Sequence, residues 1–135
     1  MNKKIVGIGC LIIILIIVFT ASSDSGLDES VISQTIFVDA VYEPENNIVL
    51  IKYVDSSEMT KLVTLEILGM EKTFHKEFLQ QSFVETVQIS SIPQYGWATM
   101  PVIFTLDHEE FGKISLKTEI HLSDEMKPRV IYSEI

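Results

Sequence analysis

The sequence predicts an all-β domain, a two-sheet antiparallel sandwich, preceded by one N-terminal transmembrane helix. Three observations lead to this prediction. A run without charged residues lies near the N-terminus, from Ile5 to Phe19. After Val31, short apolar runs recur about every 10 to 14 residues and are bounded by turn residues. No long stretch of helical periodicity follows the N-terminal run.

The N-terminal run is long enough to cross a membrane. Extended to Ala21, it would form about 25 Å of helix at roughly 1.5 Å per residue, which is the lower limit for a bilayer core of about 30 Å. Lys3 and Lys4 form a basic flank before the run, so the positive-inside rule places the N-terminus in the cytoplasm and the rest of the chain outside. The side chains that we assign to this anchor include Ile5, Leu11, Ile14, Ile17 and Phe19.

Two interpretations of this run remain open. It is either a retained signal anchor or a signal peptide that is removed, because Ala21 and Ser23 are small residues with the spacing of a cleavage site. We favour the anchor, since the run is long for a signal peptide. The predicted organisation is a transmembrane segment over 1–21, a flexible polar stalk over 22–30 and an exported sandwich over 31–135. Cleavage would instead make the protein secreted.

Alternation of apolar and polar residues predicts the strands of the sandwich. The segment from Ile48 to Val54 is apolar on both faces, so we expect it at the centre of a sheet. Seven or eight strands in a chain of this length are typical of a sandwich of immunoglobulin or fibronectin type III size. The segments that alternation or apolar content assigns to strands are 36–42, 48–54, 61–68, 83–89, 102–106, 113–122 and 130–132.

Two segments of the predicted domain carry further expectations. Apolar and polar residues alternate without interruption over 113–122, which predicts one strand with His121 on its solvent-facing side. The segment 71–81 is ambiguous, because Phe74 and Phe78 would share a face in a helix and in a strand alike. We favour a strand, since strand-like runs flank it on both sides.

Composition and charge exclude several classes of function. The formal net charge is −9, with 19 acidic residues, which excludes a nucleic-acid partner because such a partner requires a basic face. The single cysteine, Cys10, excludes a disulfide scaffold and a C-x-x-C redox site. The sequence contains no G-x-S-x-G, H-E-x-x-H or phosphate-binding glycine motif. We therefore expect no enzyme activity and no cofactor; a small hydrolase would need a nucleophile–base pair that these motifs do not reveal.

The histidines offer at best a weak metal site. His108 lies beside Glu109 and Glu110 in a predicted loop, and His121 lies on the next strand, so we expect the two rings to be far apart. A metal ion needs several ligands that converge in space. We expect surface histidines and no metal site, with His108 and His121 as the weak candidates.

The segment 92–101 is the most unusual loop, because it combines Tyr95, Trp97 and Met100 with two prolines. Exposed aromatic residues on a rigid loop are good anchors for a partner or a ligand. These residues are therefore the candidates for partner or ligand binding. The alternative, which we favour for Trp97, is that its ring folds over the open end of the sandwich as a plug of the core.

These observations favour a non-enzymatic, membrane-anchored extracytoplasmic interaction or accessory module, such as a small subunit of a membrane or cell-surface complex. A short stalk would keep the domain within a few nanometres of the bilayer, which favours another membrane or surface protein as the partner. The alternative is a secreted or anchored domain that binds a metal ion or another ligand. The sequence does not identify the partner or the ligand.

Overall fold

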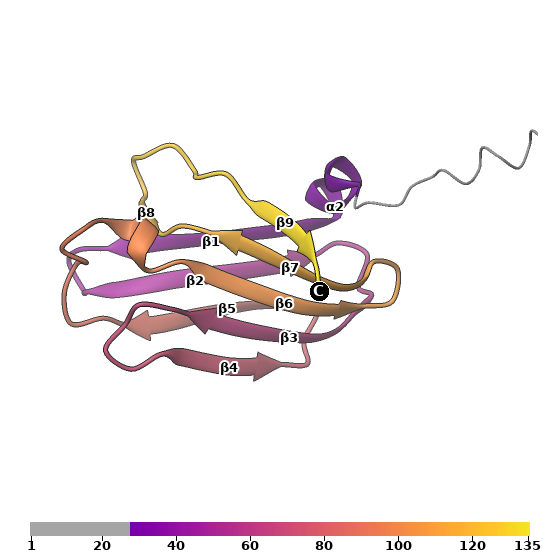
Figure 1. The fold of residues 1–135 in the computed structure, drawn as a ribbon, viewed down its shortest axis with the longest axis horizontal. Coiled ribbons are helices and arrows are strands. Elements are labelled where there is room, and N and C mark those ends of the chain that lie inside the picture. The colour runs from indigo at the N-terminus through magenta and orange to yellow at the C-terminus, as the bar shows by residue number, and fades with distance from the viewer. Residues whose placement is uncertain (1–27) are drawn as a thin grey trace, which may run out of the picture.

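The computed structural model describes residues 28–135, which form a β-sandwich of two packed sheets (Figure 1). The predicted anchor over 1–21 and most of the predicted stalk over 22–30 lie outside these residues. Within the described residues, no helix is both long enough and apolar enough to cross a membrane. The prediction of a mainly β, two-sheet architecture is confirmed for this part of the chain.

The chain order of the elements follows the predicted strands closely. One short helix precedes the strands, and a single 3₁₀ turn interrupts them. The elements are α2 (Glu29–Thr35), β1 (Ile36–Glu43), β2 (Ile48–Asp55), β3 (Thr60–Ile67), β4 (Phe74–Phe78), β5 (Ser82–Gln88), η1 (Trp97–Thr99), β6 (Val102–His108), β7 (Gly112–Thr118), β8 (His121–Leu122) and β9 (Ile131–Glu134).

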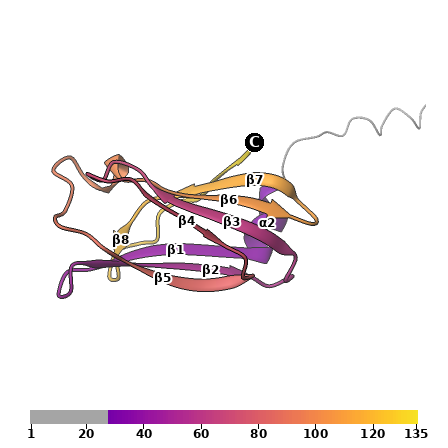
Figure 2. The same ribbon diagram turned by 90° about the horizontal axis from the view of Figure 1, so that it is seen from below.

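The first sheet has the strand order β5-β2-β1-β8, and the second has the order β4-β3-β6-β7-β9. Figure 2 shows the two sheets as separate layers, with β1, β2 and β5 in one and β3, β4, β6 and β7 in the other. The strand β2 lies between two neighbours, as its two-sided apolar pattern predicts. The strand preference for 71–81 is also confirmed, because Phe74 and Phe78 of β4 pair with Ile67 and Val63 of β3.

The stalk prediction is wrong at its C-terminal end, where helix α2 begins. The Asp28 carboxylate caps this helix and accepts a hydrogen bond from the Val31 backbone N–H at 3.4 Å. Ile32 is buried and belongs to the core, so the helix is packed onto the sandwich. A helix of seven residues is too short for its periodicity to stand out in the sequence.

The single strand predicted over 113–122 is interrupted. The strand β7 ends at Thr118, and the chain then crosses to the first sheet, where β8 pairs with β1 in parallel. Ile120, in the crossing, is fully buried. His121 is also buried, so its predicted place on the solvent-facing side is wrong. The parallel pairing of β8 with β1 is likewise a departure from the predicted antiparallel sandwich.

Alternate residues of the strands point inward and build one core between the sheets. Burial alternates residue by residue along β1, β2 and β6, and from Leu62 onward in β3 and Lys113 onward in β7, as a sheet with one packed face requires. The side chains with the least exposure include Ala40, Val49, Ile51, Tyr53, Val63, Leu65, Ile67, Val102, Phe104, Ile114 and Leu116.

The sandwich has two distinct ends. At the helix end, α2 meets the β2–β3 turn, where the Ser56 N–H and Oγ donate to the Thr35 carbonyl oxygen at 2.9 and 3.1 Å. The opposite end, here called the loop end, holds the turns 44–47, 68–73 and 89–101. The chain therefore enters the sandwich at one end, while its longest connection lies at the other (Figure 1).

We expect Gly69→Ala to destabilise the protein more than Gly112→Ala. Both glycines have a positive φ, +83° and +73°, which costs another residue about 1–2 kcal/mol. A Cβ at Gly69 would also overlap the carbonyl oxygen of Thr99, whereas a Cβ at Gly112 would meet nothing within 4 Å. The free energy of unfolding should fall by about 1 kcal/mol for Gly112→Ala and by about 3 kcal/mol for Gly69→Ala. Urea unfolding of the full-length chain measures both values, and equal losses would contradict the predicted overlap.

Candidate functional site

The loop that carries the three candidate residues crosses the loop end of the sandwich. Trp97 is half-buried and packs against the core, and its ring centroid lies 5.1 Å from that of Tyr42 on β1. Met100 is 5% exposed and belongs to the core. Trp97 thus has the placement expected of a core plug, and Met100 does not present its side chain at the surface.

Tyr95 differs from its two neighbours because its side chain is 80% exposed. A tight turn presents it: the Gly96 N–H donates to the Pro93 carbonyl oxygen at 3.2 Å, and Gly96 has a φ of +96°. The turn is followed by η1, whose Trp97 is fixed to the core. An aromatic side chain is therefore held in solvent by a loop that is anchored close to it.

A cavity of about 470 Å³ lies beside this loop. The apolar residues of its lining are Met70, Ile89, Pro93 and Met100, and the lining also contains two residues of opposite charge, Glu71 and Lys72. Its volume falls within the range of small-ligand sites, roughly 300–1,000 Å³. The cavity can hold an apolar group of modest size with a polar rim. The residues that line it are Gly69, Met70, Glu71, Lys72, Gln88, Ile89, Ser90, Ser91, Pro93 and Met100.

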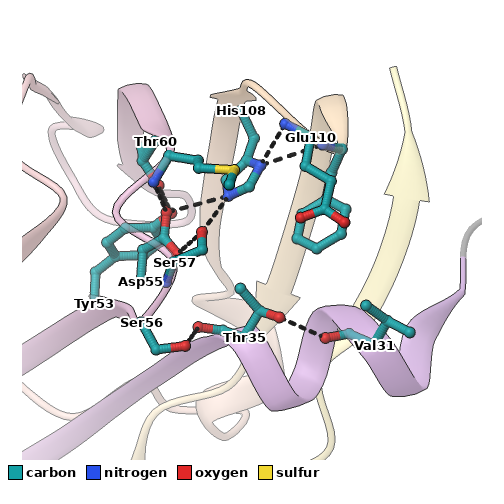
Figure 3. Close-up of polar contacts among 11 residues, drawn as sticks. Val31, Thr35, Tyr53, Asp55, Ser56, Ser57, Thr60, His108 and Glu110 are labelled. Atoms are coloured by element: carbon teal, nitrogen blue, oxygen red, sulfur yellow. Dashed lines mark hydrogen bonds and ion pairs between the residues drawn. The ribbon is translucent and has the colours of Figure 1, made fainter.

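The helix end contains a buried polar cluster around the carboxylate of Asp55 (Figure 3). One carboxylate oxygen, Oδ1, accepts from the Ser57 hydroxyl at 2.6 Å and from the Ser57 N–H at 2.9 Å. The other, Oδ2, accepts from the Thr60 hydroxyl at 2.6 Å and from the Met59 N–H at 3.1 Å. The Thr60 hydroxyl uses its one hydrogen to donate to Asp55. In the 2.7 Å contact between the Tyr53 and Thr60 oxygens, the Tyr53 hydroxyl is therefore the donor.

His108 completes this cluster from the second sheet. Its Nδ1 accepts the backbone N–H groups of Glu110 and Phe111 at 3.0 and 3.2 Å, so the ring proton must lie on Nε2. Nε2 donates to Asp55 Oδ2 at 3.1 Å, and both side chains are fully buried. The expectation that His108 lies in a solvated loop is therefore wrong: it is the last residue of β6 and faces the core.

The grouping of Ser57, His108 and Asp55 has the residue types of a hydrolase triad but not its geometry. In a triad, the acid and the nucleophile contact opposite ring nitrogens, so that the free nitrogen takes the serine proton. Here Ser57 Oγ lies 3.3 Å from Nε2, the nitrogen that also contacts Asp55, and the Ser57 hydroxyl donates to Asp55. No ring nitrogen is left as a base for Ser57, and the cluster is suited to holding the turn in place.

Burial and hydrogen bonding set the protonation of this cluster. Burial tends to raise the pKa of Asp55, but the hydrogen bonds from Ser57 and Thr60 outweigh it, and the pKa lies below the ordinary value for an aspartate. Burial raises the pKa of Tyr53 well above its ordinary value, so the phenol keeps its proton. The cluster therefore contains one ionised carboxylate with hydrogen-bond donors directed at it.

His121 forms a second contact with a carboxylate, partly buried, on the first sheet. Its Nε2 lies 2.7 Å from Asp39 Oδ1, and its Nδ1 lies 2.7 Å from the Leu122 carbonyl oxygen. The ring therefore contacts a carboxylate oxygen with one nitrogen and a backbone carbonyl oxygen with the other. This pair joins β8 to β1 and accounts for the position of the two-residue strand.

The structure does not bring the two histidines together. His108 lies at the helix end on β6, and His121 lies on β8, which pairs with the distal half of β1. Among residues 28–135, no group of three or more histidine, cysteine, aspartate or glutamate side chains is arranged to hold a metal ion. Each histidine is instead paired with one carboxylate of the fold.

Comparison with known proteins gives no relative from which a role could be transferred. No family model matches the chain, and neither a curated protein nor a solved structure matches it.

The inward positions of Asp55 and His108 follow from the alternation in the sequence, but the predicted strands ended before these two residues. Val49, Ile51 and Tyr53 alternate inward along β2, and one further step of the same period places Asp55 inward. The same extension along β6, from Leu106, places His108 inward. A charged or titratable residue at an inward position needs a hydrogen-bond partner. Here Asp55 and His108 are each other's partners.

We expect Asp55→Asn to lower the free energy of unfolding by about 3 kcal/mol at pH 7, because it removes the charge to which buried donors are directed. The substitution should also change the pH dependence. The folded pKa of Asp55 is lowered, so its contribution is present above about pH 4 and is lost as the pH falls through the folded pKa. The variant should lack that loss. Urea unfolding between about pH 2 and pH 7 measures both effects.

Glu110→Gln is the matched control, since its side chain is exposed in the next turn. If the free energy of unfolding of the wild type does not fall as the pH drops below about 4, the role given to the Asp55 carboxylate is contradicted.

Proposed function

We propose that this chain is a non-enzymatic interaction module held outside the cytoplasm by an N-terminal anchor, and that it serves a membrane or cell-surface complex. The uncharged run from Ile5 to Phe19, with Lys3 and Lys4 before it, supports the anchor. The β-sandwich, of immunoglobulin or fibronectin type III size, would be the exported part. The short helix α2 would make the link between anchor and sandwich shorter than the stalk that we expected.

The observation that carries this proposal is the position of Tyr95. Its exposed ring lies at the loop end, opposite the end at which α2 enters the sandwich. With an anchor before α2, the loop end would point away from the membrane and toward a partner's extracytoplasmic part. Tyrosine is a frequent contact residue at interfaces, because a large ring is held at a small entropic cost.

The arrangement of the buried polar groups supports a non-enzymatic role. The serine, histidine and aspartate at the helix end satisfy one another, and their contacts leave no free base for Ser57. The cluster is buried between the β2–β3 turn and the β6–β7 hairpin, where it ties the two sheets together. We therefore assign it to stability.

Ligand binding is the second candidate function, and the cavity of about 470 Å³ favours it. An apolar lining with a few polar residues suits a small, mainly apolar molecule, and the opposite charges of Glu71 and Lys72 do not select the charge of that molecule. The metal-binding version of this candidate has no support from the geometry of residues 28–135, since His108 and His121 lie apart and each contacts a carboxylate.

We expect Tyr95→Ala to reduce crosslinking of the full-length protein to its partner in native membranes by about tenfold, which corresponds to about 1.4 kcal/mol of contact energy. The free energy of unfolding should change little, because the side chain is exposed. Leu79→Ala is the control: Leu79 is 76% exposed but lies in the β4–β5 turn at the helix end. Equal crosslinking in the two variants would contradict the role of the loop end.

The anchor is tested separately by carbonate extraction of membranes, followed by the intact mass of the protein in each fraction. A full-length mass in the membrane pellet is expected. A soluble species that begins near Ser23 or Asp24 would overturn the anchored form of the proposal and leave a free exported domain.

A further inference from the structure

Hydrogen bonds between backbone groups fix both sides of the cavity of about 470 Å³ at the loop end. The Leu68 N–H donates to the Pro101 carbonyl oxygen at 3.1 Å, which ties the β3–β4 turn to the β5–β6 connection. On the other side, the Ile89 N–H donates to the Asn47 carbonyl oxygen at 3.0 Å, which ties the start of that connection to the β1–β2 turn. The cavity is therefore pre-formed, and a group can enter it with little rearrangement of the chain.

Exposed apolar side chains lie next to this cavity. Leu68, Ile92 and Tyr95 are 38%, 56% and 80% exposed, and Leu68 and Ile92 are chain neighbours of residues that line the cavity. A small molecule held inside the cavity would leave these three side chains in water. A protein surface would cover them together with the cavity, which is the arrangement of an interface with an apolar centre. The exposed side chains therefore favour a protein as the occupant.

The β5–β6 connection is uncharged, but it leads from the cavity to an acidic part of the loop end. Residues 89–101 contain no charged side chain, and Trp97 of this connection packs on Tyr42 of β1. The segments 43–47 and 119–125 beside Tyr42 contain neither lysine nor arginine. Both contribute to one hollow of about 360 Å³, which is lined by Tyr42, Glu43, Pro44, Glu45 and Ser123. The acidic residues of the two segments are Glu43, Glu45, Glu119, Asp124 and Glu125.

Charge limits what can occupy this surface. Acidic groups attract basic groups and repel other acidic groups. A second copy of this chain carries the same formal net charge of −9, so it would be repelled, and so would an anionic lipid surface. The loop end thus combines an apolar centre, formed by the cavity and the β5–β6 connection, with an acidic border. A protein segment that is apolar at one position and basic around it complements both parts.

We propose that the loop end binds a basic segment of another protein, and that this segment inserts one large apolar side chain into the cavity. Met70, Ile89 and Met100 would pack around that side chain, while lysine or arginine residues of the segment face Glu43 and Glu45. A buried apolar anchor supplies most of the binding energy of such a contact, and the charges set its orientation. The partner's position at the loop end rests on the proposed function; the chemistry of the segment is new.

The first experiment reads the sequence of the bound segment directly. A photoreactive phenylalanine replaces Ile92 in the full-length protein in native membranes, and mass spectrometry sequences the crosslinked peptide of the partner. We expect a peptide that contains a large apolar residue and more lysine and arginine than aspartate and glutamate. The same probe at Leu79, which is 76% exposed at the helix end, is the matched control and should give a yield about tenfold lower.

A bulky residue at the cavity tests the apolar part of the contact. Ser91 lines the cavity and is exposed, so Ser91→Trp adds an indole there without disturbing the core. The yield of partner trapped by a soluble amine-reactive crosslinker should fall about tenfold. Thr86→Trp is the control, since Thr86 is exposed on β5 and does not line the cavity, and its yield should equal that of the wild type.

A charge reversal tests the acidic border. Glu45→Lys should lower the yield of the same crosslink about fivefold, because it places a positive charge opposite a basic segment. Glu109→Lys makes an identical change in net charge in the β6–β7 hairpin at the helix end, and should leave the yield unchanged. Both residues are exposed, so the free energy of unfolding should change little in either variant.

Tyr95→Ala separates this inference from the proposed function. If Tyr95→Ala lowers the crosslinking while Ser91→Trp and Glu45→Lys do not, the contact at the loop end stands and the basic, cavity-filling segment is ruled out. A crosslinked peptide with an excess of acidic residues, or a product of twice the chain mass, would also overturn the inference. A small molecule that native mass spectrometry finds on the wild type but not on Ser91→Trp, with equal crosslinking of the two, would assign the cavity to that molecule.

Discussion

The buried carboxylate of Asp55 is the interaction on which the helix end of the sandwich depends. Asp55 ends β2 in the first sheet, while Thr60 and His108 lie on β3 and β6 in the second. One charged group therefore fixes the β2–β3 turn and the β6–β7 hairpin to each other across the core. A buried charge of this kind is tolerated because each oxygen accepts several donors, and the turn residues Ser57 and Met59 supply part of them.

The pair of His121 and Asp39 has the corresponding role along the edge of the first sheet. The chain leaves the second sheet after Thr118, and the two residues of β8 supply few backbone hydrogen bonds to hold it on β1. The histidine adds contacts to a carboxylate and to the Leu122 carbonyl oxygen, and the Glu125 carboxylate accepts the Leu122 N–H at 3.0 Å. Side chains thus hold a strand that backbone pairing alone would hold weakly.

The strands were predictable from the sequence because alternation records which face of a strand is packed. This holds for β1, β3 and β6, whereas β2 was predicted from its apolar content on both faces, and the strand-like flanks of 71–81 correctly favoured β4. The break after Thr118 was not predictable in the same way, since Ile120 and Leu122 continue the period of β7 while the chain changes sheets. Helix α2 was missed because seven residues give too little periodicity. The candidate loop could be located, but which of Tyr95, Trp97 and Met100 is exposed depends on tertiary packing.

The way in which the sides of the sandwich are closed limits how it can associate. β4 and β5 are edge strands of opposite sheets, and Phe78 of one stacks on Phe83 of the other at 3.7 Å between ring centroids. Lys76 and Glu85 occupy core-facing register positions on these strands and form an ion pair at 3.2 Å. Charged residues placed inward on an edge oppose the addition of a further strand, because pairing would bury them. Addition of a further strand at the β4 and β5 edges is therefore disfavoured.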